Sequence, residues 1–447
     1  MKGKTNSHGG DNAPEPKKTL NSFLGQLEAE NLIIKIKKPV SQRLEASSLM
    51  YALDGKALYF PKVGESDFPV VANLFSSRDI IAKYLSCSAS AIVQKMSEAI
   101  RHPSEPVQVA TAPFFENQIS PVDLDRLPLL FHYPQDGGKY LSSAVVIAKD
   151  GELGQNCSFH RMMQLGKDTL VARILPRHLS EFVKRNGGTL DVAICIGMPP
   201  QVLISSSTSV EIGVDELKIA NTLLPFDAVK LPSGISVPAD TQIVMEATIT
   251  KELADEGKFV DLTETYDIVR KQQVVKVHKI HYKSGAFYHA LLPGGLEHKI
   301  LMGMPREPTI YEEVNKSCKC TGVNITPGGC SWLHAVVAIE KKSEDDSKKA
   351  LEAAFRGHKS LKHCIVVDSD IDIYAPGSVE WALATRFQAK GGLVVKPNEK
   401  GSSLDPSADP NTRETSKMGI DATRPLVAKG KDFTRALMPK INVEGYI

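Results

Sequence analysis

The chain has 447 residues, of which 42% are hydrophobic and 24% are charged, an ordinary balance for a globular protein of two or three domains. Its 54 basic and 52 acidic residues give a net charge of +2, which excludes the strongly basic character typical of nucleic-acid-binding proteins. No apolar run is long enough to span a bilayer and residues 1–18 lack a secretory signal, so we expect a cytoplasmic protein without membrane or nucleic-acid partners.

The predicted elements begin after residues 1–18, which are rich in Lys, Gly, Asn and Pro and are predicted to be a disordered tail. Apolar residues then recur at helical spacing from Leu20 to Leu27, which indicates an amphipathic helix. Two strand-like runs and two helical runs follow, at 57–63, 69–75, 77–85 and 89–101. Together these elements predict a small α/β domain over residues 19–115.

Strand patterns dominate the middle of the chain. They occur at 144–148, 170–175, 192–197, 243–250 and 274–281. Only two helices are expected among them, at 178–185 and 215–223. This density of strands predicts a barrel or a folded-over sheet over residues 116–305.

After Pro305 the pattern changes to alternating helices and strands. The predicted elements are a helix at 309–315, a strand at 335–340, a helix at 345–356, a strand at 364–367 and a helix at 378–388. The alternation predicts an α/β domain with a parallel sheet over residues 306–447. Beyond Lys390 the chain is rich in Gly, Pro, Ser and Asp as far as Pro425, which predicts a long loop or an extended arm that reaches a neighbouring subunit of a homo-oligomer.

Several widespread motifs are absent from the sequence. There is no GxGxxG after a strand, no GxxxxGK[ST], no HExxH and no GxSxG. The seven cysteines, an odd number, indicate free thiols in a reducing compartment. Cys318, Cys320 and Cys330 have the wrong spacing for a zinc knuckle, and no fourth ligand is evident.

The segment Asn156-Cys-Ser-Phe-His-Arg161 is the first of several motifs whose order and spacing resemble the UbiD family of prenylated-FMN-dependent decarboxylases. The others are Pro176-Arg177-His178, Ser205-Ser206-Ser207-Thr208, Gly213-Val214-Asp215-Glu216, Glu256-Gly-Lys-Phe-Val-Asp261 and Lys362-His-Cys-Ile-Val-Val-Asp368. The resemblance extends from about Pro121 to about Pro425. It implies a multidomain α/β fold in which a flavin-reductase-like split β-barrel lies between a small N-terminal domain and a C-terminal α/β domain that mediates oligomerisation.

The resemblance implies that Asn156, His178 and Glu216 bind a metal that ties the flavin phosphate to the protein. One amide oxygen, one imidazole and one carboxylate suit Mn²⁺ or Mg²⁺ better than Zn²⁺. The resemblance also implies a monovalent-ion site, such as one for K⁺, beside the Ser205–Thr208 run. The residues expected to contact the cofactor, besides the metal ligands, are Ser158, Phe159, His160, Arg161, Arg177, Ser206, Thr208 and Lys362.

Decarboxylation leaves an electron pair on carbon, and no amino-acid side chain accepts it well, so a cofactor must act as the electron sink. The planar fork of Arg161 can hold the carboxylate that is lost. The resemblance implies that Glu256 and Asp261 form a catalytic pair, in which Asp261 delivers the proton and Glu256 holds Arg161. Lys258 stands where the family usually has Pro, and Val260 where it usually has Gly.

The UbiD family acts on aromatic acids, on α,β-unsaturated acids and, in an archaeal isoprenoid pathway, on anhydromevalonate 5-phosphate. His160, Arg173, Arg177 and Lys258 add cations to the pocket motifs, as a phosphorylated substrate requires. Only 6% of the residues are aromatic, and the segment 413–423 is similar to that of archaeal members. These features favour conversion of trans-anhydromevalonate 5-phosphate to isopentenyl phosphate and CO₂, with a flavin prenyltransferase as the supplier of the cofactor.

Two alternatives remain at this stage. The first is an aromatic or phenolic acid decarboxylase of the same family. The second is an FMN-dependent oxidoreductase built on the same type of barrel, which leaves Arg161, Glu256 and Asp261 without a role. A non-catalytic flavin-handling scaffold needs no such acid–base set at all.

Overall fold

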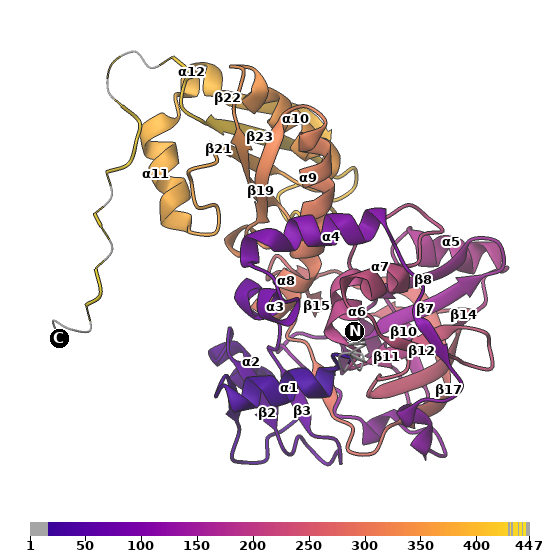
Figure 1. Ribbon diagram of the computed structural model, residues 1–447. Helices are drawn as coiled ribbons and strands as arrows, with labels where there is room; N and C mark the ends of the chain where they lie inside the picture. The colour runs from indigo at the N-terminus through magenta and orange to yellow at the C-terminus, as the bar shows by residue number, and fades with distance from the viewer. Residues whose placement is uncertain (1–16, 428–429, 431, 437, 440, 444–447) are drawn as a thin grey trace, which may run out of the picture.

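The computed structural model describes residues 17–427, 430, 432–436, 438–439 and 441–443 (Figure 1). Residues 1–16, which make up most of the predicted disordered tail, lie outside the described residues. The described chain forms an N-terminal region, a central antiparallel sheet and a C-terminal α/β domain, so the predicted multidomain α/β fold is confirmed. Among the described residues, no helix is both long and apolar enough to cross a membrane.

The N-terminal region packs helices against a four-stranded sheet of order β1-β2-β3-β18. Its first helix begins at a capping box, in which Thr19 and Ser22 satisfy each other's backbone N–H groups, and it buries Phe23 in the core. The elements are α1 (Leu20–Ala29), β1 (Ile33–Lys35), α2 (Glu45–Ala52), β2 (Ala57–Phe60), β3 (Val70–Ala72), α3 (Arg78–Tyr84), η1 (Ala89–Ala91), α4 (Ile92–Arg101) and β18 (Tyr288–Ala290).

The central region is a nine-stranded antiparallel sheet. Its strands are β5 (Asn117–Ile119), β6 (Tyr140–Leu141), β7 (Val145–Asp150), β8 (Gly154–Phe159), β9 (Met162–Gln164), β10 (Thr169–Ala172), β11 (Leu190–Ile196), β14 (Ile243–Glu256) and β17 (Arg270–Tyr282). Successive side chains point to opposite faces, so Val244 packs in one core and Met245 in the other. This sheet accounts for the density of strand patterns in the middle of the sequence.

Short elements surround this sheet and position its loops. They are β4 (Val107–Val109), η2 (Pro113–Glu116), η3 (Leu124–Arg126), α5 (His178–Arg185), α6 (Pro200–Ser205), α7 (Glu216–Leu223), β12 (Asp227–Lys230), β13 (Ser236–Pro238), β15 (Phe259–Val260) and β16 (Tyr266–Asp267). Helices α5 and α7 both pack against β8, the strand that carries Asn156.

The C-terminal domain has a mixed sheet of order β19-β20-β21-β23-β22, in which β20, β21 and β23 run parallel. Helices cover both faces, so Val337 packs with Ile310 of α9 while its neighbour Val336 packs with Val379 of α11. The elements are α8 (Leu296–Gly303), η4 (Met304–Arg306), α9 (Glu307–Asn315), β19 (Lys319–Ile325), η5 (Pro327–Gly329), β20 (His334–Glu340), α10 (Asp346–Gly357), β21 (His363–Asp368), α11 (Pro376–Arg386), α12 (Ala389–Gly392), β22 (Leu393–Lys400) and β23 (Glu414–Ala422).

The prediction of a long loop or arm from Lys390 to Pro425 was wrong over most of that stretch. Strand β23 pairs in parallel with β21, and β22 then pairs with β23 at the edge of the sheet. Only residues 401–413 form the loop that the Ser- and Asp-rich composition indicates. The hydrogen bonds of a preformed sheet edge stabilise both strands, and local composition carries no sign of that edge.

A buried ion pair ties the C-terminal domain to the N-terminal region, beside the place where α4 lies between them (Figure 1). Arg78 at the start of α3 pairs with Glu307 at the start of α9, and the Glu307 side chain is 1% exposed. Glu307 also accepts the backbone N–H of Ile325 at 3.0 Å, and the Arg78 guanidinium lies 4.7 Å from the Tyr374 ring. Three segments far apart in the sequence therefore meet at one carboxylate.

We predict that Arg78→Met lowers the free energy of unfolding by about 3–5 kcal/mol, because it leaves Glu307 buried without its cation. Denaturant unfolding followed by circular dichroism measures the change. Lys35→Met is the matched control, because it removes an exposed pair with Glu28 and is expected to cost less than about 1 kcal/mol. Equal effects of the two substitutions would contradict the proposed link between the domains.

Candidate active site

Arg161, between β8 and β9, is held by three carboxylates. Its Nε donates to Glu256 Oε1 at 2.9 Å and its Nη2 to Glu256 Oε2 at 3.0 Å. Its Nη1 donates to Asp261 Oδ2 at 2.8 Å and its Nη2 to Asp267 Oδ2 at 2.8 Å. The guanidinium lies 4.6 Å from the Phe259 ring centroid. The structure thus brings together the three predicted catalytic residues, in a network that leaves Arg161 one N–H to spare.

The three carboxylates differ in how firmly they are fixed. The Glu256 side chain is fully buried, whereas that of Asp261 is 20% exposed. Burial alone lowers the pKa of Arg161, but the charges of Glu256 and Asp261 outweigh it and raise that pKa. Asp261 is therefore the partner of Arg161 that solvent and ligands reach most easily.

Asp267, at the end of β16, is a site residue that the sequence analysis missed. It also accepts a hydrogen bond from Arg270, and Arg173 Nε lies 3.8 Å from its Oδ2. Burial raises the pKa of Asp267, but Arg270 and Arg161 outweigh burial and lower it, so the carboxylate stays ionised. The signal in the sequence was a further acid close to the catalytic pair, six residues after Asp261.

A second segment of the chain packs against the end of β14, where Glu256 lies. The Tyr140 hydroxyl lies 3.1 Å from Glu256 Oε1 and 3.1 Å from the Gly257 carbonyl oxygen. A Cβ added to Gly137 would lie 2.5 Å from the Cα of Gly257, so the two backbones meet where only glycine fits. Burial, with the charge of Glu256, raises the pKa of Tyr140, which keeps the hydroxyl protonated.

His298 of α8 adds a neutral imidazole beside the Arg161 network. Its Nδ1 accepts the backbone N–H of Gly294 at 3.0 Å, so Nε2 carries the proton. Burial lowers the pKa of His298 to about 4, with the nearby charges of Asp261 and Arg161 acting in opposite directions. His298 is therefore a neutral hydrogen-bond donor at neutral pH.

Five residues before Arg161 on β8, Asn156 meets Glu216 at the start of α7. The Asn156 amide nitrogen donates to Glu216 Oε1 at 3.0 Å, and the Cys157 backbone N–H donates to Glu216 Oε2 at 2.8 Å. Burial raises the pKa of Glu216 to about 8. Reversing the terminal amide would face two oxygens toward each other, which is the donor arrangement that a divalent cation requires. These two residues fit a metal site.

His178, the third predicted ligand, is the first residue of α5 and is half-buried. It shares an electrostatic neighbour with Glu216, since Arg306 interacts with both side chains, but no hydrogen bond or ion pair joins it to Asn156 or Glu216. No group of three or more His, Cys, Asp or Glu side chains suited to a metal occurs among the described residues. The predicted set, with its amide, has only two side chains of those types, so metal binding by it stays a prediction.

A chain of hydrogen bonds continues from Asn156 to His160. Ser158 Oγ lies 3.1 Å from Asn156 Oδ1 and 3.0 Å from His160 Nε2, and His160 Nδ1 donates to the Arg173 carbonyl oxygen. Burial lowers the pKa of His160 to about 4, so this ring is neutral. The sequence analysis counted His160 as an additional cation, and that interpretation was wrong because the ring is buried.

Three further residues predicted to contact the flavin are Phe159, Ser206 and Thr208. Phe159 is half-buried at the end of β8, and Ser206 donates its hydroxyl to the Val202 carbonyl oxygen at 2.7 Å. Ser205 Oγ and Thr208 Oγ1 are buried and have no hydrogen-bond partner among the described residues. Buried hydroxyls usually have partners, so these two atoms fit the polar groups of a flavin or of a monovalent ion.

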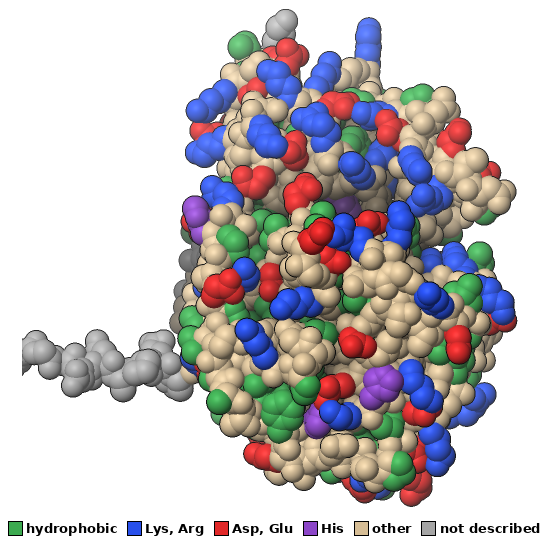
Figure 2. Space-filling view, turned by 90° about the vertical axis from the view of Figure 1, so that its right-hand side faces the viewer, with side chains coloured by type: hydrophobic (Ala, Val, Ile, Leu, Met, Phe, Trp, Pro, Cys, Tyr) green, Lys and Arg blue, Asp and Glu red, His purple; other side chains and the backbone are tan. Residues whose placement is uncertain are grey.

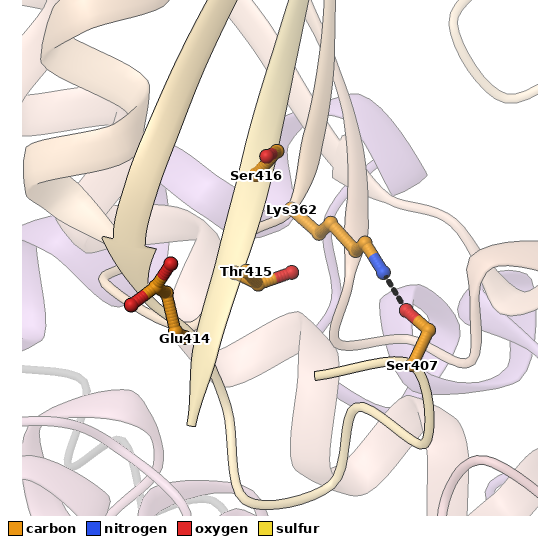
Figure 3. A pocket seen from close by; sticks show the side chains of 5 residues that line it. All are labelled: Lys362, Ser407, Glu414, Thr415 and Ser416. Atoms are coloured by element: carbon orange, nitrogen blue, oxygen red, sulfur yellow. Dashed lines mark hydrogen bonds between the residues drawn. The ribbon is translucent and has the colours of Figure 1, made fainter. Parts of the chain in front are cut away.

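Lys362 lies apart from both clusters, in a pocket of the C-terminal domain that Ser407, Glu414, Thr415 and Ser416 also line (Figure 3). Its Nζ pairs with Asp405 at 2.9 Å and bonds the Ser407 hydroxyl. These two partners use two of the three N–H donors of Nζ. Arg177, at the start of α5, is exposed.

Comparison with known proteins gives three matching family models. The Rift-related, N-terminal and C-terminal domain models of 3-octaprenyl-4-hydroxybenzoate carboxy-lyase match residues 105–296, 24–100 and 299–422. This chain belongs to the UbiD family. The anhydromevalonate phosphate decarboxylase of Methanothermobacter thermautotrophicus is 38% identical over 420 residues, which cover 92% of this chain and 98% of that relative.

Two solved structures of UbiD-class proteins are similar over nearly the whole chain. The enzyme HmfF of Pelotomaculum thermopropionicum in complex with FMN has a TM-score of 0.92 and 35% identity, and covers 96% of this chain and 100% of its own. An evolved dimeric form of HmfF in complex with prFMN has a TM-score of 0.88 and 34% identity, with the same coverage. UbiD-family membership confirms the resemblance that the sequence motifs indicate.

We predict that Tyr140→Phe lowers kcat about tenfold and leaves KM nearly unchanged, because Glu256 loses a hydrogen bond that fixes its carboxylate beside Arg161. Steady-state kinetics over a range of pH is the measurement, and the acidic limb of the profile is expected to shift. Tyr133→Phe is the matched control, since its hydroxyl bonds only the Pro293 carbonyl oxygen, at 2.8 Å. If the two substitutions lower the free energy of unfolding equally and neither changes kcat, Tyr140 has no positioning role.

Proposed function

We propose that this chain is a prenylated-FMN-dependent decarboxylase that converts trans-anhydromevalonate 5-phosphate to isopentenyl phosphate and CO₂. The observation that carries the proposal is the Arg161 guanidinium, which Glu256 fixes in two places while the more exposed Asp261 lies beside it. The name of the Methanothermobacter thermautotrophicus relative, similar over almost its full length, supports the choice of substrate.

In the proposed reaction the bond between the carboxylate carbon and the alkene carbon breaks, CO₂ leaves, and the alkene carbon takes a proton. The prenylated flavin, when bound, supplies the electron sink for this step. The substrate carboxylate replaces one of the protein carboxylates that bind Arg161, and the guanidinium then holds it. Asp261 is the suitable partner to exchange, because it is the most exposed of the three. Once released, it would deliver the proton that the alkene carbon needs.

The other two carboxylates have positioning roles in this proposal. Glu256 keeps the guanidinium plane fixed through its two bonds to Nε and Nη2. Asp267 is tied to Arg270 and lies near Arg173, so it anchors the far side of the network. Arg161, Arg173 and Arg270 balance the charges of the three acids. Entry of a substrate carboxylate therefore favours protonation of one acid, as a proton donor requires.

For the cofactor we propose that Asn156, His178 and Glu216 hold Mn²⁺ or Mg²⁺, which binds the flavin phosphate. The fit of Asn156 and Glu216 to a cation and the free hydroxyls of Ser205 and Thr208 support this placement. A metal would also keep Glu216 ionised, which burial otherwise opposes. The Ser205–Thr208 run is the place for K⁺ if a monovalent ion binds.

We further propose two partners. A flavin prenyltransferase supplies the modified cofactor, since nothing in the proposed reaction makes it. A second copy of this chain covers apolar side chains that the described residues leave exposed. Val395, on the edge strand β22, is 59% exposed, and Met438 and Ile441 beyond the sheet are 90% and 69% exposed.

We predict that the protein, co-expressed with a flavin prenyltransferase and assayed without oxygen in the presence of Mn²⁺, releases CO₂ and isopentenyl phosphate from trans-anhydromevalonate 5-phosphate. Arg161→Met is expected to lower kcat/KM at least a hundredfold, because the substrate carboxylate loses its charge-assisted hydrogen bonds. Product release is followed by phosphorus NMR. Turnover of a phenolic acid alone would overturn the proposed substrate. An unmodified bound FMN with nicotinamide-dependent turnover would favour the alternative of an FMN-dependent oxidoreductase.

A further inference from the structure

Arg306, at the junction of η4 and α9, differs from every other largely buried arginine in the described part of the chain. Arg78, Arg161, Arg173 and Arg386 each lie in an ion pair with one or more carboxylates. Arg306 is 8% exposed, yet its side chain forms no ion pair or hydrogen bond with the described residues, and its Nε is enclosed without an acceptor. Burial of an unpaired charge is strongly destabilising, so this guanidinium is built for an anion that is not a protein side chain.

The surroundings of Arg306 hold the guanidinium in place without neutralising it. Its Cζ lies 5.3 Å from the Trp332 ring centroid, and the Trp332 indole N–H donates to Ser402 Oγ at 3.1 Å. His358 packs edge-on against the same indole and donates Nε2 to the Trp332 carbonyl oxygen. The arginine is therefore oriented before any ligand arrives, which lowers the entropic cost of binding one.

A cation and a carboxyl group both interact with Arg306 electrostatically. Its pKa is lowered to about 9 by burial first and by the charge of Arg177 second, while Glu216 acts in the opposite direction. Glu216 already accepts hydrogen bonds from Asn156 and Cys157. Glu216 therefore lies near Arg306 without being its hydrogen-bond partner.

A helix N-terminus adds to the same place. Helix α5 has eight residues and begins at His178, and the side chain of its N-cap, Arg177, makes no capping hydrogen bond. Both residues are electrostatic neighbours of Arg306. The first N–H groups of a helix are unpaired and carry partial positive charge, so they favour an anion. Arg306 and the start of α5 come from distant parts of the sequence, and both present N–H groups that suit an anion.

We infer that Arg306, Arg177 and the N-terminus of α5 form a binding site for a phosphate monoester. The planar fork of a guanidinium matches two phosphate oxygens, and the helix N-terminus accepts a third. Two sources share this chemistry, namely the phosphate of the flavin and the 5-phosphate of the substrate. The second source rests on the proposed function, whereas the first does not.

The first test uses inorganic phosphate and thermal unfolding of the flavin-free protein in a chelator, so that no divalent cation contributes. Phosphate is expected to raise the melting temperature of the wild type and of Arg306→Lys, which keeps the charge, but not that of Arg306→Met. Without phosphate, Arg306→Met should melt at or above the temperature of the wild type, because it removes a buried unpaired charge. Arg43→Met is the matched control, since Arg43 also lies over an aromatic ring, that of Phe131, but forms no part of this site.

The second test separates the two sources. Flavin titrations in Mn²⁺ compare FMN with riboflavin, and kinetics of the cofactor-loaded enzyme compare the phosphorylated acid with its dephosphorylated form. A tenfold or greater loss of FMN affinity in Arg306→Met, down to that of riboflavin, assigns the site to the cofactor. A tenfold or greater rise in KM for the phosphorylated acid alone assigns it to the substrate.

Two results would overturn the site. Phosphate could stabilise Arg306→Met as much as the wild type, with both FMN affinity and KM unchanged, or the wild type could show no response to phosphate at all. Failure to turn over the phosphorylated acid would refute the proposed function but not the phosphate site, because the thermal and flavin titrations do not depend on turnover.

Discussion

The ion network around Arg161 is the constraint on which the rest of the site depends. Carboxylates compensate the charge of this buried guanidinium, and here three acids from the end of β14 and the loop region after it do so. That loop follows β14, the long strand that crosses the centre of the nine-stranded sheet. The sheet thus fixes Glu256, Glu256 fixes Arg161, and Arg161 determines where a carboxylate can bind.

Charge is distributed unevenly along the path from Arg161 to Arg306. At one end Arg161 has more acidic partners than it needs, so a substrate carboxylate must displace one of them. At the other end Arg306 has no acidic partner among the described residues. A hollow lies between the C-terminal lobe and the rest of the molecule, and Lys and Arg side chains are dense on that lobe (Figure 2). The arrangement suits a ligand with a carboxylate at one end and a phosphate at the other.

The motifs predicted those residues that lie close together in the chain, and the structure added those that do not. Asn156 and Arg161 are five residues apart, and so are Glu256 and Asp261, so their spacing was visible in the sequence. Tyr140 lies 116 residues before Glu256, and Arg306 is brought near Glu216 by the junction between domains, so neither has a local signal. The sequence analysis overestimated the number of cations in the pocket motifs, because His160 is buried and neutral, which composition does not reveal. Strands β22 and β23 were missed because the sheet that stabilises them begins far earlier in the chain.

The most direct test of the central claim is a crystal structure of the cofactor-loaded protein with mevalonate 5-phosphate, a saturated analogue that lacks the double bond needed for reaction. We predict that the carboxylate of the analogue binds Arg161 in place of Asp261, while Glu256 keeps its two hydrogen bonds to the guanidinium. An analogue whose carboxylate binds elsewhere, with Arg161 still held by all three acids, would contradict the account.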